Sequence, residues 1–165
     1  MLILKNRTVF NSLYELDKSC FEKQNTNLKS LQAVYPNGPA VDIAPSGVLG
    51  GSVAAIKVGD DKNYTVYPAD GTAAYKAIGL FVNDALGNPF DNAPAVASNK
   101  IAIAQKLASV LVDVYEDDEF AIGDKLYASE NGYLTKTAGS DDTVIGIVTK
   151  LPTAADPFLG LEMKI

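Results

Sequence analysis

A run of acidic side chains is the part of this sequence whose residue types could most readily do chemistry. Its members are Asp113, Glu116, Asp117, Asp118, Glu119 and Asp124. Several carboxylate oxygens in one loop can hold Ca²⁺, and a pair such as Asp113 and Glu116 can act on a glycosidic bond. The run lacks the regular aspartate spacing of a calcium loop, and nothing sets the separation of a catalytic pair. We therefore expect a solvated turn with no metal site.

The other reactive groups are few. Cys20 is the single cysteine and the chain has no histidine, so no imidazole can activate the thiol, which we expect to fill apolar space. Asp141 and Asp142 lie in a small polar stretch, residues 138–143, which we interpret as the tip of a loop. We predict that the protein is not an enzyme and needs no cofactor.

The overall charge limits the partners. A formal net charge of -6 argues against direct binding of nucleic acid, because phosphate recognition requires a basic face. The apolar run at residues 1–4 is too short for a signal peptide, and no stretch approaches the length of a membrane span. We expect neither nucleic acid nor membrane as a partner.

The clearest structural signal lies between Ile122 and Leu151, where strand-like and turn-like residues alternate. Residues 125–128 and 144–150 predict strands, and a shorter return strand begins at Tyr133. Asn131 and Gly132 both tolerate positive φ and predict a two-residue type I′ turn. This stretch can position side chains but contains no group suited to bond-making chemistry.

Further strands are predicted at residues 52–58, 64–67, 72–82 and 159–165. Asp70 and Gly71 predict a hairpin turn before the third of them. Residues 100–115 alternate in two phases, which indicates two β segments with a bend near Lys106. Short strands at this regular spacing predict an all-β fold, a small β-barrel or sandwich.

Two segments share one order of residues, in which a Gly-Asp pair is followed by tyrosine, a turn glycine and an Ile-Gly pair. They span residues 58–82 and 122–148. The turn glycines are Gly71 and Gly132, where a tight turn requires positive φ. The interior glycines are Gly79 and Gly146, which indicate a bulge or a close backbone approach. We interpret the repeat as the same need, for a tight turn followed by a bulge or close backbone approach, arising at two places in the chain.

The first part of the chain differs in composition. We predict an N-terminal arm and loop-rich linker at residues 1–50 and a β-barrel or sandwich domain at 51–165, because proline and glycine are dense at residues 31–51. The spacing of Phe10, Leu13 and Tyr14 predicts a short amphipathic helix starting near residue 11. Such a helix either packs on its own domain or docks on a neighbouring subunit, and the sequence leaves both open.

Residues 122–132 read Ile-Gly-Asp-Lys-Leu-Tyr-Ala-Ser-Glu-Asn-Gly, and residues 143–148 read Thr-Val-Ile-Gly-Ile-Val. Together with the alternating residues 159–165, this order resembles the capsid decoration (cement) proteins of tailed bacteriophages. Residues 77–84 resemble an earlier segment of the same proteins, so the resemblance covers residues 52–165.

The resemblance implies a compact β-barrel on the outer capsid surface of the virion, made in the bacterial cytoplasm, that stabilises the phage head. The implied partners are the major capsid protein and further copies of the chain, with a trimer favoured. Many weak copies acting together need only modest contacts. Phe10, Leu13 and Tyr14 are hypothesised to make capsid or inter-subunit contacts, because the arm lies outside the matched region.

A second function remains open at this point, namely a carbohydrate-binding or fibre-like adhesion module of a virion or cell surface. Tyrosines on the expected strands could form a sugar-binding face, although cross-strand packing explains them equally well. These residues are Tyr64, Tyr67, Tyr75, Tyr115, Tyr127 and Tyr133.

Overall fold

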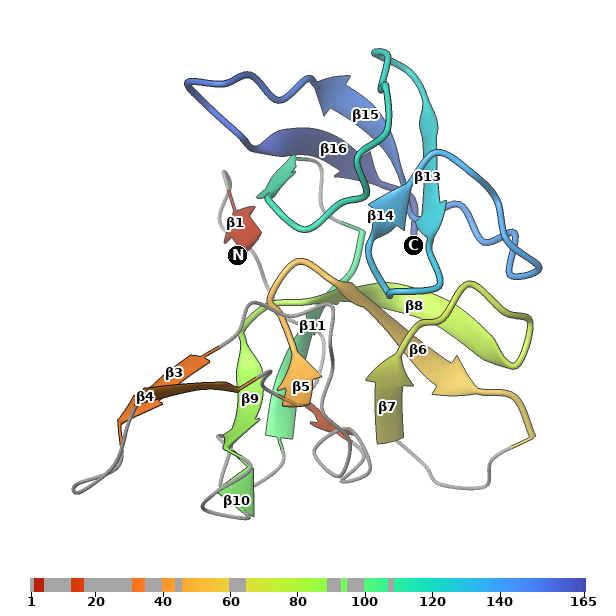
Figure 1. Ribbon diagram of the computed structural model, residues 1–165. Coiled ribbons are helices and arrows are strands. Elements are labelled where there is room, and N and C mark those ends of the chain that lie inside the picture. The colour runs from red at the N-terminus through yellow and green to blue at the C-terminus, as the bar shows by residue number, and fades with distance from the viewer. Residues whose placement is uncertain are drawn as a thin grey trace.

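The chain forms an all-β structure in the computed structural model. The structure describes residues 2–4, 13–16, 31–34, 40–43, 46–59, 65–88, 93–94, 100–106 and 109–165. Within these ranges every regular element is a β-strand, so the predicted fold class is confirmed. Two curled β units lie one above the other, with two small sheets beside the lower one (Figure 1).

The upper unit in Figure 1 is an antiparallel sheet of six strands. In spatial order they are β1 (Leu2–Leu4), β12 (Val110–Val112), β16 (Leu159–Met163), β15 (Gly146–Lys150), β13 (Lys125–Ala128) and β14 (Leu134–Thr135). The sheet curls until β14 meets the chain that follows β12. There Tyr115 bridges Leu134, and the Glu116 N–H donates to the Leu134 carbonyl at 2.8 Å.

The lower unit is a closed barrel of five strands. They are β11 (Lys100–Ala104), β2 (Leu13–Leu16), β7 (Thr65–Pro68), β6 (Val53–Lys57) and β8 (Tyr75–Phe81). All neighbours are antiparallel except β2 and β7, which run parallel. Because the barrel is closed, its strands leave no free edge.

The two small sheets lie near the barrel (Figure 1). One contains β10 (Ala93–Pro94), β9 (Ala85–Asn88) and β5 (Ser46–Val48), and the other is the hairpin of β3 (Leu31–Val34) and β4 (Ala40–Ile43).

One hydrophobic cluster among the described residues contains side chains from both the barrel and the six-stranded sheet. The barrel contributes Val53 and Leu80 to it, and the sheet contributes Leu126, Ile145 and Leu161, all fully buried. Because burial of apolar surface is the main favourable term in folding, a shared core couples the two units energetically. We therefore treat them as parts of one folding unit.

Most strands fall where the sequence predicted them. Strands β6, β7, β8, β13 and β15 lie within or beside the expected ranges. In the last predicted strand, Leu159, Leu161 and Met163 are buried while Glu162 is exposed. The bend near Lys106 is also confirmed, because Lys106 has a φ of 52° between β11 and β12.

The hairpin predicted at Asn131 and Gly132 is confirmed, because β13 and β14 pair antiparallel, but its turn is not type I′. At the turn after β13 only Gly132 has positive φ, and its N–H donates to the Ser129 carbonyl at 3.0 Å, so the loop has three residues rather than two. The Ser129 hydroxyl explains the wider loop, because it accepts from the N–H groups of Asn131 at 3.2 Å and Tyr133 at 3.1 Å.

The predicted hairpin at Asp70 and Gly71 is wrong, because β7 and β8 do not pair. Strand β6 lies between them, with Ala55 opposite both Tyr67 and Ala77. The chain thus crosses over β6 at this turn. The Asp70 carboxylate stabilises the crossover locally by accepting from the Thr72 N–H at 2.9 Å and hydroxyl at 2.6 Å.

The short helix expected near residue 11 is wrong. Leu13–Leu16 is strand β2, because it pairs with both β11 and β7 and a short isolated helix has no comparable stabilisation. The loop-rich stretch that follows contains the short strands β3, β4 and β5. Strands β1 and β2 each complete a sheet built mainly from later residues, while the division near residue 50 stays a prediction.

Candidate functional site: the polar junction between barrel and sheet

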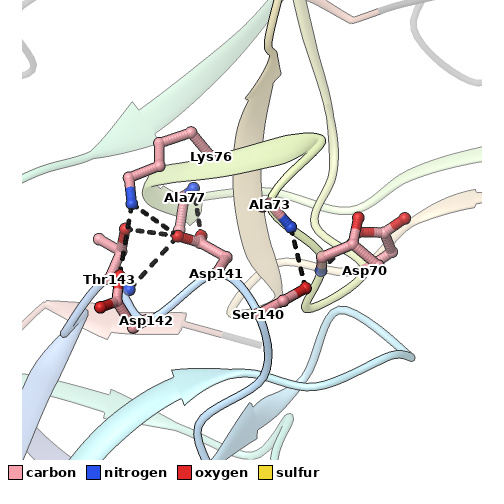
Figure 2. Close-up of polar contacts among 9 residues, drawn as sticks. Asp70, Ala73, Lys76, Ala77, Ser140, Asp141, Asp142 and Thr143 are labelled. Carbon is pink, nitrogen blue, oxygen red and sulfur yellow. Dashed lines mark hydrogen bonds and ion pairs between the residues drawn. The ribbon is translucent and has the colours of Figure 1, made fainter.

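Asp141 is the most deeply buried charged side chain of the described residues, with 2% of its surface exposed. It lies in the loop between β14 and β15. One carboxylate oxygen, Oδ2, accepts from the Ala77 N–H at 2.8 Å. The other, Oδ1, accepts from Lys76 Nζ at 2.9 Å and from the Thr143 hydroxyl at 2.7 Å (Figure 2). Both oxygens are therefore used to hold β8 and the loop together.

The backbone of the same loop makes further contacts with the β7–β8 crossover. The Ser140 hydroxyl accepts from the Ala73 N–H at 3.2 Å (Figure 2). The Asp141 N–H donates to the Gly71 carbonyl at 3.0 Å. Gly139 lies so close to the Gly71 carbonyl that a side chain there would overlap it. We call this set of contacts, between residues 71–77 and 139–143, the junction.

Opposing influences act on the Asp141 carboxyl. Burial raises its pKa, but hydrogen bonds from Thr143 and the Ala77 N–H, together with the Lys76 ammonium, outweigh burial and hold the pKa below its ordinary value. The hydrogen bond between the Lys76 ammonium and the Asp141 carboxylate raises the pKa of Lys76. Asp142 adds only a looser contact, because its Oδ1 lies 3.8 Å from Lys76 Nζ and its side chain is 86% exposed.

The lowered pKa of Asp141 predicts a loss of stability in acid. A carboxyl whose folded pKa is below its unfolded value stabilises the fold fully above the unfolded pKa, which is about 3.9 for aspartate. That stabilisation falls as the pH drops through the folded pKa. We expect Asp141→Asn to flatten this part of the curve of unfolding free energy against pH below about pH 4, measured by urea titrations. An unchanged slope would contradict the assignment.

The two turn glycines of the repeat pack on each other's turns. Gly71, with a φ of +71°, lies against the backbone of residues 128–130, where a Cβ would be 3.0 Å from the Ala128 carbonyl oxygen. Gly132, with a φ of +74°, lies against Ala69, where a Cβ would be 2.8 Å from the carbonyl oxygen. The Gly132 carbonyl also accepts from the Val53 N–H at 2.8 Å. The repeated segments thus form one interface between barrel and sheet.

The interior glycines allow close strand packing. A Cβ on Gly79 would overlap the Ala104 carbonyl oxygen of β11. A Cβ on Gly146 would lie 2.8 Å from the Glu162 carbonyl oxygen of β16. At both positions a side chain would push neighbouring backbone away, so Gly79 allows close strand packing within the barrel and Gly146 allows it within the six-stranded sheet.

Two carboxylates of the acidic run accept hydrogen bonds from the β13–β14 hairpin. Glu116 accepts from the Asn131 amide at 3.0 Å, and Asp118 accepts from the Thr135 hydroxyl at 2.7 Å and the Lys136 N–H at 3.0 Å. Across the ranges that the structure describes, no group of three or more acidic, cysteine or histidine side chains is placed to hold a metal ion. These carboxylates fasten residues 116–118 to the β13–β14 hairpin.

Several of the tyrosines pack against other aromatic rings. Tyr67 and Tyr75 meet edge to face with ring centres 5.6 Å apart, and Tyr115 meets Phe120 at 5.8 Å. The Tyr115 hydroxyl also donates to the Pro157 carbonyl at 2.7 Å. Aromatic packing therefore accounts for these rings, whereas Tyr64 lies outside the described residues.

The sequence did not predict the role of Asp141. We expected a solvated loop tip, which is wrong because the carboxylate is buried against β8. The local signal is the Asp-x-Thr spacing, since Asp141 Oδ1 also accepts from the Thr143 N–H at 3.3 Å. Of the arm residues, Leu13 and Tyr14 lie in β2, opposite Ala102 and Ile101, and Phe10 lies outside the described residues.

Comparison with known proteins found no match among protein-family models, curated proteins or solved structures. In the part of the chain that the structure describes, no helix is long and apolar enough to cross a membrane.

Proposed function

We propose that the chain is a structural protein of a tailed-phage virion, which binds the outer surface of the capsid and stabilises the shell. The observation that supports this best is that the residues resembling decoration proteins form strands and a packed turn of the scaffold. Residues 122–132 and 143–148 form β13, most of β15 and the turn at Gly132, which packs on the barrel. Rigid scaffolding of this kind suits a protein that acts by binding.

The proposed partners are the major capsid protein and other copies of the chain, with a trimer favoured. A decoration protein occupies many equivalent positions, so avidity multiplies modest contacts. Phe10, Leu13 and Tyr14 are the residues proposed to make part of the capsid or inter-subunit contact.

The direct test is binding to purified heads that lack decoration. We expect the full chain to bind at a fixed ratio to the major shell protein, measured by sedimentation and gel densitometry. Deleting residues 1–33 would also remove β1, β2 and most of β3, so single substitutions to serine at Phe10, Leu13 and Tyr14 are better probes. If an aromatic residue anchors the contact, its loss costs about 2 kcal/mol, or roughly thirtyfold in affinity.

Thr149→Ala is a suitable control, because Thr149 is exposed on β15. Each variant must first match the thermal unfolding of the unchanged chain. Normal occupancy by all three serine variants would contradict the contact site, whereas failure of the unchanged chain to bind heads would contradict the function. Binding to a glycan array without affinity for heads would favour the adhesion module instead.

A further inference from the structure

Strand β1 is held in the six-stranded sheet by one neighbour. It pairs antiparallel with β12, with Leu2 opposite Val112, Ile3 opposite Leu111 and Leu4 opposite Val110. It is the last strand in the order of that sheet, and the next strand after β12 on the other side is β16. The edge of β12 is thus a seat for one extended strand.

The seat is apolar as well as hydrogen-bonding. Leu2 is 9% exposed and belongs to the same buried cluster as Val110 and Val112. A strand on this edge therefore gains main-chain hydrogen bonds from β12 and buries a leucine in the core. These are the two components of recognition by strand addition, in which backbone pairing supplies affinity and alternate side chains supply specificity.

The chain reaches this seat from a distant part of the fold. Strand β1 directly precedes β2 in the order of strands, and β2 lies in the barrel between β11 and β7. Strand β12, by contrast, follows only after the remaining strands of the barrel. An element joined to its sheet by a connection from another unit can occupy the same seat in a second protomer, because identical contacts form in both cases.

We infer that the edge of β12 is a strand-binding site and that its second occupant is Leu2–Leu4 of another copy of this chain. Within one chain the tethered strand has an effective concentration on the order of 1 mM. Exchange therefore becomes favourable when copies are crowded to a similar concentration, as on an ordered surface. The exchange requires only two copies of the chain and does not depend on binding to a capsid.

Directed cross-linking of the full chain tests the exchange. Ile3→Cys and Leu111→Cys are made separately in a Cys20→Ser background, because directly opposed antiparallel residues have Cα atoms about 4.5–5.5 Å apart, within disulfide reach. The two variants, one carrying a size tag, are unfolded, mixed, refolded at about 1 mM protein and oxidised. Non-reducing gels then separate mixed dimers from dimers of one variant.

We expect I3C and L111C to form mixed dimers. The control mixture, I3C with T149C, should form few, because Thr149 lies on β15, which does not pair with β1. A chain carrying both I3C and L111C reports on the seat itself. If that chain links only internally and the mixed variants form no more dimers than the control, the strand stays with its own chain and exchange is wrong. If the chain carrying both cysteines forms no disulfide at all, β1 does not pair with the edge of β12.

Discussion

Replacing Asp141 by alanine is expected to destabilise the protein by about 3 kcal/mol. The substitution removes an acceptor from the buried Ala77 N–H and from the Thr143 hydroxyl, and it removes the partner of the Lys76 ammonium. A buried donor left without an acceptor costs about 1–3 kcal/mol, and hydrogen bonds to a charged group are stronger than neutral ones. The Lys76 side chain is half-exposed, so water can solvate its ammonium and compensate for the lost ion pair.

Asp142→Ala is the matched control for this prediction. The two aspartates are adjacent and carry the same charge, but the Asp142 side chain is 86% exposed. Its one contact with Lys76 is loose, with 3.8 Å between Oδ1 and Nζ. Its loss should change the unfolding free energy by no more than about 0.5 kcal/mol. Equal effects of the two substitutions would show that net charge, rather than the buried contacts, matters at the junction.

Urea unfolding at neutral pH measures both variants. For a chain of this size a loss of 3 kcal/mol corresponds to a fall in Tm of roughly 6–12 °C. Because barrel and sheet share one core, the unchanged protein should unfold in a single transition. A second transition in Asp141→Ala alone would mean that the junction couples the two units.

The sequence allowed the fold class and most strands of the barrel and the sheet to be predicted, because alternation and β-branching are local signals. The bend at Lys106 is one example, since the phase of the apolar residues changes there. Strand order was not predictable in the same way. The turn at Asp70 has the composition of a hairpin, yet β6 separates the strands on either side, and only the packing of distant segments decides this.

The junction was missed for a related reason. Asp141 lies among small polar residues, and such a stretch usually forms an exposed loop. Its burial depends on the β7–β8 crossover, about seventy positions earlier in the chain. This crossover supplies the Ala77 N–H and the Gly71 carbonyl. Leu13 was assigned to a helix because helical spacing is local, whereas its strand partner Ala102 is distant in the sequence.

Replacing Gly132 by alanine should cost about 3 kcal/mol or more. A φ of +74° alone costs alanine about 1–2 kcal/mol. In addition, the new Cβ would be 2.8 Å from the Ala69 carbonyl oxygen, closer than real contacts allow. Relief requires the backbone to move, and Val53 opposes this because its N–H binds the Gly132 carbonyl while its carbonyl binds the Ala69 N–H.

Gly123→Ala separates the two costs. Gly123 also lies in a turn and has a φ of +94°, but a Cβ added there would meet nothing within 4 Å. Its substitution should therefore cost only the conformational strain, about 1–2 kcal/mol. The difference between the two variants in urea unfolding measures the contact between the repeated turns. Equal losses would mean that the Gly132 turn can shift away from Ala69 at no cost.

The reciprocal packing of Gly71 and Gly132 makes a sharper prediction for the double variant. Each glycine faces the backbone of the other's turn, so one alanine already forces the pair of turns apart. The second alanine then adds mainly its own strain, and the double variant should be at least about 0.5 kcal/mol more stable than the sum of the single losses predicts. Strict additivity would indicate two independent turns. Coupling would mean that the two repeated segments are each other's packing surface.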